Sequence, residues 1–252
     1  MPVDTAPVTL ITPLRWLALG WKDLQANPVP GLVHGFLLAL FGGILAFAAR
    51  DQFWWLAGAF SGFLIVAPVL ATGLYAVSRA REKGQTIGLS EILSLWTSGD
   101  RRLIAFGLLL GLAGTGWVLT SAGLITLWSD VPIRRPADFL RHVVLADSLG
   151  LFEAWLLLGA LLAAPMFASS VLTLPLLVDT RAPLWVAVTQ SWRAVGNYPG
   201  PLAFWAMLIA VLVALGMATF LLGLILIVPL LGHASWHAYR DLLPPGDDGR
   251  VL

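Results

Sequence analysis

The sequence predicts an all-α membrane protein with six transmembrane helices in three hairpins, each hairpin preceded by a short amphipathic helix at the membrane interface. Three observations support this prediction. The chain of 252 residues is 58% hydrophobic and only 12% charged, its apolar residues gather into long runs, and one tryptophan- and proline-containing segment occurs twice. Soluble domains carry about 25% charged residues. The solvent for most of this chain must therefore be lipid.

A transmembrane helix needs about 20 consecutive apolar residues. Four separate runs meet this requirement, at residues 30–49, 53–77, 103–128 and 150–178. Two more spans share residues 201–239, which are too many for one helix, and we divide this run near residues 216–220. The prediction is a single membrane domain over residues 1–252, in which residues 243–252 form a flexible C-terminal tail.

The distribution of lysine and arginine predicts the orientation, because these residues accumulate in cytoplasmic segments. With the N-terminus inside, eleven of them fall in inner segments and four in outer loops; the outer four are Arg50, Arg134, Arg135 and Arg141. Both termini are therefore expected on the cytoplasmic side.

Two segments suggest an internal repeat. "WKDLQANPVP" (21–30) and "WRAVGNYPGP" (192–201) share a tryptophan, a basic residue, an aliphatic residue and two prolines at the same spacing. "IVAPVLATGLYAVSR" (65–79) resembles "LIVPLLGHASWHAYR" (226–240) in the same way. The pattern predicts units at about 14–80, 88–180 and 184–241, of which the middle one fits loosely. Whether all three units are related or only the outer two stays open.

Four prolines fall within the expected spans and predict kinks there, because proline removes a helical hydrogen bond. They are Pro68, Pro165, Pro175 and Pro229. They could line a central cavity on the repeat axis. The simpler interpretation is that membrane helices tolerate proline where neighbouring helices satisfy the backbone.

The segments before the hairpins have the apolar and polar faces of interfacial helices. The first carries Leu14, Leu17 and Trp21 near one face. The second, "TIGLSEILSLWTSG", has Ser90 as the expected N-cap. The third is "APLWVAVTQSWRAVGNYPGP". Such helices could dock a partner protein, or only orient the spans.

Composition excludes several classes of function. The net charge of +1 and the lack of an aromatic-basic motif exclude a nucleic-acid partner. The absence of cysteine excludes disulfides, iron–sulfur clusters and thiolate metal sites.

Two histidines are candidate metal or haem ligands. His233 and His237 are one helical turn apart, which is the spacing of two ligands on a helix. His34, near the start of the first span, could join them if the first and sixth spans touch. A zinc protease would need a glutamate where Ala234 stands. The alternative is that both imidazoles hydrogen-bond carbonyls or headgroups at a helix end.

The two ends of the chain, "RWLALGWKDLQANPVPGL" and "PLLGHASWHAYRDL", resemble the bacterial integral-membrane family known as domain of unknown function 2189. The resemblance covers about residues 12–243. It implies a bacterial inner-membrane protein with about six spans, and no catalytic role. Some relatives carry a cytochrome c oxidase label. The resemblance marks as its signature stretch Gly232, His233, Trp236, His237, Tyr239, Arg240 and Asp241.

The expected function is that of a non-enzymatic accessory or assembly component of a membrane complex, for which a respiratory complex is the first candidate. Its partners would be the lipid bilayer and other membrane subunits, or a second copy of the chain. No cofactor is expected. The alternatives are a small transporter or channel on the repeat axis, and a haem- or metal-binding protein that uses the three histidines.

Overall fold

The computed structural model describes residues 7–145 and 150–243, except for the side chains at 60, 61, 64, 65 and 68. The expected tail from 244 onward lies outside the described residues. Where the chain is described it forms helices joined by turns, without a strand. The elements are α1 (Thr12–Ala26), α2 (Pro28–Ala48), α3 (Phe53–Glu82), α4 (Leu89–Trp96), α5 (Arg101–Trp128), α6 (Pro136–Phe139), the π-helical segment η1 (Leu140–Val144), α7 (Leu151–Ser170), α8 (Thr173–Asp179), α9 (Leu184–Asn197), α10 (Pro199–Ala218) and α11 (Leu224–Leu242).

Within the described residues, four stretches are long and apolar enough to cross a membrane. They are Pro28–Ala48, Arg101–Trp128, Leu151–Asp179 and Pro199–Ala218. The all-helical membrane architecture is thus confirmed. The other two expected spans correspond to α3, with 30 residues, and α11, with 19 residues. The long run at 201–239 is interrupted between α10 and α11, where Phe220 and Leu221 adopt positive φ angles of 54° and 70°.

Two of the amphipathic segments are separated from the following span by a single residue. Asn27 (φ −141°, ψ 75°) lies between α1 and α2, and Tyr198 (φ −128°, ψ 53°) lies between α9 and α10. Each precedes the proline that begins the span. A residue before proline is disfavoured in the α conformation because the proline ring clashes with it. The same sequence pattern therefore produces the same bend at both places.

The second amphipathic segment, which forms α4, starts differently from the prediction. The N-cap of α4 is Gly88, not Ser90, which lies inside the first turn. Its first turn is closed by Glu91, whose carboxylate accepts a hydrogen bond from the Gly88 N–H at 3.0 Å. This pairing satisfies a backbone donor that would otherwise be free at the helix start.

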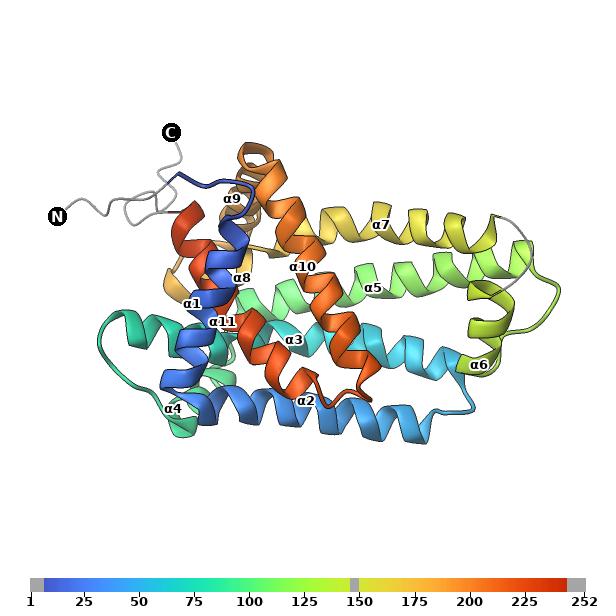
Figure 1. Cartoon of the computed structure of the whole chain (residues 1–252), viewed down its shortest axis with the longest axis horizontal. Helices are drawn as coiled ribbons and strands as arrows, with labels where there is room; N and C mark the ends of the chain where they lie inside the picture. The colour runs from blue at the N-terminus through green and yellow to red at the C-terminus, as the bar shows by residue number, and fades with distance from the viewer. Residues whose placement is uncertain (1–6, 146–149, 244–252) are drawn as a thin grey trace.

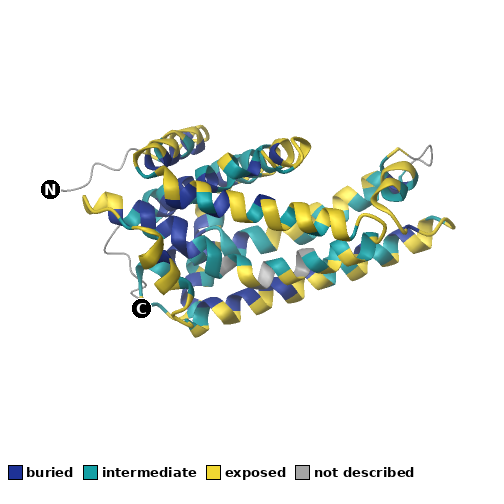
Figure 2. Cartoon of the chain, turned by 90° about the horizontal axis from the view of Figure 1, so that it is seen from below, coloured by how far each residue is buried: buried dark blue, intermediate teal, exposed yellow. Residues whose placement is uncertain are grey.

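The helices form an elongated bundle (Figure 1), in which α2, α3, α5 and α7 run along its length and α1, α4, α8 and α9 gather at one end. Buried residues concentrate toward that end (Figure 2). The main core joins residues of α1, α8, α9, α10 and α11 around Trp16, Trp205 and Trp236. A smaller cluster around Ile125, Val143 and Leu151 lies on α5, η1 and α7.

The last helix, α11, packs against α1, α2 and α3, and glycines permit the closest crossings. A Cβ on Gly20 of α1 would lie 2.6 Å from the backbone nitrogen of Ala234. A Cβ on Gly35 of α2 would overlap the backbone carbonyl of Ile225. Only glycine lets helix backbones approach this closely, as small residues do generally in membrane proteins.

Candidate functional site

The centre of the candidate site is the carboxylate of Asp23, whose side chain is 7% exposed. It lies on α1 and receives contacts from two other helices. Its Oδ1 is 2.7 Å from the Arg81 guanidinium, and its Oδ2 accepts a hydrogen bond from the Ser78 hydroxyl at 2.6 Å. The same Oδ2 lies 2.8 Å from His237 Nε2. One carboxylate thus connects α1, α3 and α11.

A second histidine extends this cluster. His233 is fully buried, and its Nδ1 lies 2.9 Å from the Ser78 hydroxyl oxygen. Because Ser78 gives its only proton to Asp23, His233 Nδ1 must donate to Ser78. In a nucleophilic serine the imidazole instead accepts the serine proton. The arrangement therefore holds helices together and does not activate Ser78.

The third predicted ligand, His34, has different partners. Its Nδ1 lies 2.6 Å from the Pro30 carbonyl oxygen, and its ring packs edge-on against Trp96 with centroids 4.9 Å apart. The Nε2 atoms of His34 and His233 are both buried without a hydrogen-bond partner among the described residues. Within the part of the chain that the structure describes, no three His, Asp or Glu side chains are grouped as a metal-binding set.

The pKa of Asp23 is lowered below its ordinary value. Burial alone would raise this pKa, but the hydrogen bonds from His237 and Ser78 and the charge of the nearby imidazoles outweigh it. The carboxylate is therefore ionised at neutral pH, and this charge suits its contact with Arg81.

A second, partly buried carboxylate, Asp179 at the end of α8, is shared by two arginines. Its Oδ1 lies 2.9 Å from Arg79 Nε on α3, and its Oδ2 lies 3.5 Å from the Arg240 guanidinium on α11. Tyr239 also donates a hydrogen bond to Oδ2 at 2.9 Å. Arg79 and Arg240 occupy equivalent positions in the two similar segments of the sequence.

The rest of the signature stretch is also used in contacts between helices. Trp236 Nε1 donates to Glu82 at 3.2 Å, and Arg240 pairs with the same carboxylate at 2.8 Å. Asp241 accepts hydrogen bonds from Arg15 and from Trp16 Nε1. Gly232 lies so close to Leu74 that an added Cβ would overlap that side chain. All of these contacts are made by residues 232–241.

The three predicted kink prolines whose side chains the structure describes lie in different places. Pro165 lies inside α7 and lines a groove of about 480 Å³ between α5, α7 and α9. Pro175 and Pro229 are buried in α8 and α11. Pro68 falls within α3, but its side chain lies outside the described residues.

Sequence reasoning missed the carboxylates and hydroxyl that pair with the signature stretch. Asp23, Ser78, Glu82 and Asp179 were not identified as partners. The available signal was the presence of acidic residues beside the spans, at Asp23, Glu82 and Asp179, in a chain of which only 12% of the residues are charged. Buried carboxylates require partners, and Arg79 and Arg81 on α3 and Arg240 on α11 are basic residues close to these carboxylates.

Comparison with known proteins identifies a family for the centre of the chain. The family model "Predicted integral membrane protein (DUF2189)" matches residues 56–179, from α3 to the end of α8. This confirms the family resemblance but corrects its extent, because the match does not include the signature stretch. No curated protein and no solved structure matches the chain. Over residues 56–179 the chain is therefore similar to the DUF2189 family of predicted integral membrane proteins.

Proposed function

We propose that this protein is a non-enzymatic accessory or assembly component of a bacterial inner-membrane complex, with a respiratory complex as the first candidate. It has six spans, of which α3 is the second and α11 the sixth, and both termini are cytoplasmic. The one-residue bends at Asn27 and Tyr198 support an origin of the outer two hairpins from one repeated unit. The excess of basic residues at one end supports the orientation.

The observation that carries the proposal is the apolar groove between α5 and α7. Its α5 wall is a helical stripe that includes Phe106, Leu110, Gly116 and Trp117. The groove holds only two polar side chains, and both are engaged. Thr120 donates to the Gly116 carbonyl at 2.8 Å, and Ser169 accepts from Trp192 at 2.9 Å.

Gly116 makes this groove suitable for another helix. A Cβ added to Gly116 would meet no atom within 4 Å, so the small residue leaves an open place in the wall. Small residues at such places let a second backbone approach closely. The occupant that we propose is an apolar transmembrane helix of a partner subunit.

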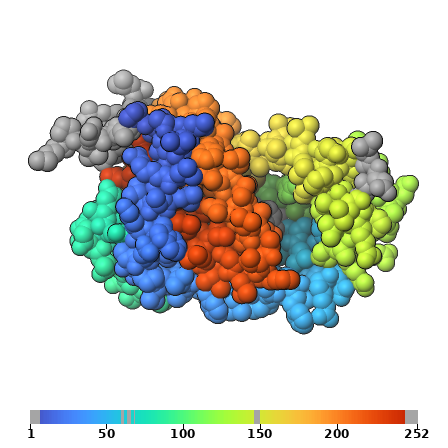
Figure 3. Space-filling view, viewed as in Figure 1, coloured from blue at the N-terminus to red at the C-terminus, as the bar shows by residue number. Residues whose placement is uncertain are grey.

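The surface of the bundle is open on a second side as well. Helix α10 packs on α11, α1 and α9, and Figure 3 shows a hollow between α10 and the end formed by α6 and α7. Exposed apolar side chains on these helices include Leu157 (72%), Leu161 (69%) and Leu215 (57%). These faces provide further area for a partner within the membrane.

The transporter alternative has less support. Its site should be a polar cavity within the spans, whereas the cavity found there has apolar walls. The polar cavities lie at the end of the bundle, beside α4 and α8. The haem or metal alternative would need nitrogen atoms of His34, His233 and His237 to converge, whereas no three His, Asp or Glu side chains among the described residues are grouped to hold a metal.

The test is complementation of a bacterial strain that lacks the protein. Assembly of respiratory complexes is measured by native gel electrophoresis and by oxygen consumption. Wild-type protein should restore assembly, and Gly116→Leu should fail because it fills the groove. Gly123→Leu is the matched control, since an added Cβ on Gly123, also on α5, has open space but lies outside the groove.

Two results would contradict the proposal. One is normal assembly of every respiratory complex in the deletion strain. The other is full complementation by Gly116→Leu at wild-type protein levels. An absorption spectrum of the purified protein tests the haem alternative separately: a Soret band lost in His233→Ala would replace the accessory role with a cofactor-binding one.

A further inference from the structure

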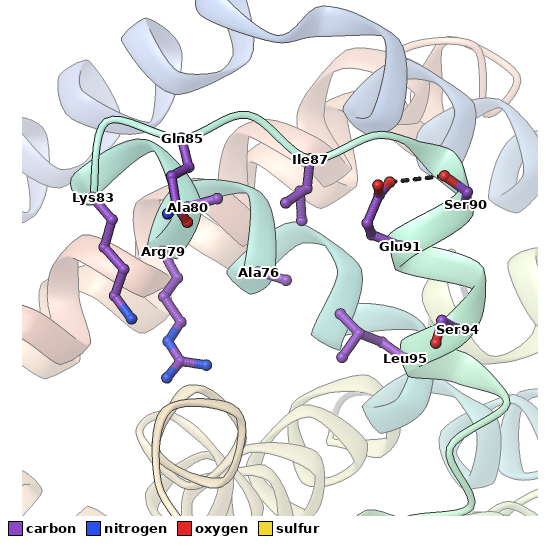
Figure 4. Close-up of a pocket in the computed structure, with 10 residues that line it drawn as sticks. All are labelled: Ala76, Arg79, Ala80, Lys83, Gln85, Ile87, Ser90, Glu91, Ser94 and Leu95. Carbon is purple, nitrogen blue, oxygen red and sulfur yellow. Dashed lines mark hydrogen bonds between the residues drawn. The ribbon is translucent and has the colours of Figure 1, made fainter.

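A polar cleft lies between the end of α3 and α4, beside the interfacial helices. Its volume is about 570 Å³. Figure 4 shows its walls, with Arg79 on α3, Lys83 directly after α3, and Ser94 and Leu95 on α4. A second cavity of about 280 Å³ adjoins it, and Arg79 and Leu95 line both.

The charges around the two cavities do not cancel. Arg79 is neutralised by Asp179 at 2.9 Å, and Arg102 by Asp100 at 2.8 Å. Lys83 in the larger cleft and Arg181 in the smaller cavity have no ion pair among the described residues.

The one acidic group of the larger cleft is already engaged. Glu91 Oε2 accepts hydrogen bonds from the Gly88 N–H at 3.0 Å and from the Ser90 hydroxyl at 2.8 Å. Its contacts therefore close the first turn of α4. Arg79 on α3 and Lys83 directly after it extend toward the same side of the cleft, as Figure 4 shows. Across the two adjoining cavities the lining carries four cations, Arg79, Lys83, Arg102 and Arg181, and three carboxylates, Glu91, Asp100 and Asp179, so a ligand meets a net positive charge.

The position of α4 indicates which anions reach the cleft. Leu89 and Leu93 are 43% and 58% exposed, so the apolar face of this helix is available to acyl chains. A helix of this kind lies at the boundary between headgroups and acyl chains. Basic pockets between transmembrane helices on the cytoplasmic side bind anionic lipid headgroups.

We propose that this cleft binds the phosphate of an anionic phospholipid headgroup, with Lys83 and Arg181 supplying the attraction. Gln85 and Ser94 line the same cleft, and their side chains are hydrogen-bond donors to the headgroup. The acyl chains lie along the apolar face of α4.

The experiment measures lipid binding to the purified full-length protein by native mass spectrometry. The probes are dioleoyl phosphatidylglycerol and dioleoyl phosphatidylcholine, which share their acyl chains. Phosphatidylglycerol should bind more tightly. In the double variant Lys83→Gln/Arg181→Gln, each substitution should lower the affinity of the protein for phosphatidylglycerol about fivefold. This factor corresponds to ~1 kcal/mol of attraction per basic residue.

The matched control is Arg134→Gln/Arg141→Gln, which removes the same charge from the far end of the bundle and should leave phosphatidylglycerol affinity unchanged. Ser94→Leu narrows the cleft without altering charge and should weaken binding too. This variant keeps the test decisive if the double variant fails to fold. Equal affinity for the two lipids, equal losses in the control, or full competition by inorganic phosphate at the lipid's own concentration would each overturn the proposal.

Discussion

His237 Nε2 lies 2.8 Å from Asp23 Oδ2, and this contact joins the first helix of the chain to the last. The two residues are 214 positions apart in the sequence. Ser78 and Arg81 contact the same carboxylate from α3. The signature stretch of α11 is thus explained by the helices that it holds together at one end of the bundle.

Replacing Asp23 should destabilise the protein. Asp23→Asn removes the charge that Arg81 and His237 face, and leaves buried donors poorly satisfied. We expect a loss of about 2 kcal/mol in the free energy of unfolding, below the range for fully enclosed pairs because Arg81 is 40% exposed. The midpoint of denaturation by SDS measures this loss. Asp51→Asn, at a 58% exposed residue, should change stability by less than about 1 kcal/mol.

The contribution of Asp23 should also depend on pH. Its pKa is lower in the folded protein than the ordinary value of 3.8. Its stabilising effect is therefore fully present above pH 3.8 and is lost as the pH falls through the folded-state pKa. The groups that face it are Ser78, Arg81, His233 and His237. The difference in melting temperature between wild type and Asp23→Asn should shrink as the pH falls below about 4. A difference that grows on acidification would contradict this assignment.

Two glycines of α2 should respond in opposite ways to the same substitution. Gly35→Ala places a methyl group against the Ile225 carbonyl of α11, which cannot move without shifting the helix. Overpacking of this kind costs about 1–3 kcal/mol. Gly43→Ala meets no atom within 4 Å and should be neutral or up to ~1 kcal/mol stabilising, since alanine favours helix. Thermal denaturation of the purified variants compares the two directly.

The six-span topology can be tested without background labelling, because the chain has no cysteine. Single cysteines are placed at Gln52, Ser129 and Leu222, after α2, after α5 and between α10 and α11. All three should react with a membrane-impermeant maleimide in intact spheroplasts. Gln85→Cys, between α3 and α4, should react only after the membrane is permeabilised. Labelling of Gln85→Cys in intact spheroplasts would contradict the orientation.

Much of the secondary structure could be predicted because it depends on local sequence. The apolar runs at 30–49 and 103–128 correspond to α2 and α5 within two residues at each end. A hydrophobic segment in lipid forms a helix because the helix satisfies all of its backbone hydrogen bonds internally. The bends before Pro28 and Pro199 also follow from a local clash. The start of α4 was misplaced because Glu91 pairs with Gly88 rather than leaving Ser90 to cap the helix.

Partners within the candidate site could not be predicted in the same way. The sequence placed His233 and His237 on one helix face, and their spacing was compatible with metal ligands. The structure gives one of them Ser78 and the other Asp23. Side-chain pairing between distant helices depends on which faces meet, and a regular apolar pattern does not specify this.

The sequence by itself determined that most of the chain lies in lipid, that the fold is all-helical, and where most helices lie. These properties depend on the apolar composition of each segment and on the positions of its prolines. Only the tertiary structure decided the role of the signature stretch. Close crossings at Gly20 and Gly35 bring α11 against α1 and α2, and those crossings set Asp23 opposite His237. The same packing leaves Gly116 uncovered and Lys83 without an ion pair among the described residues.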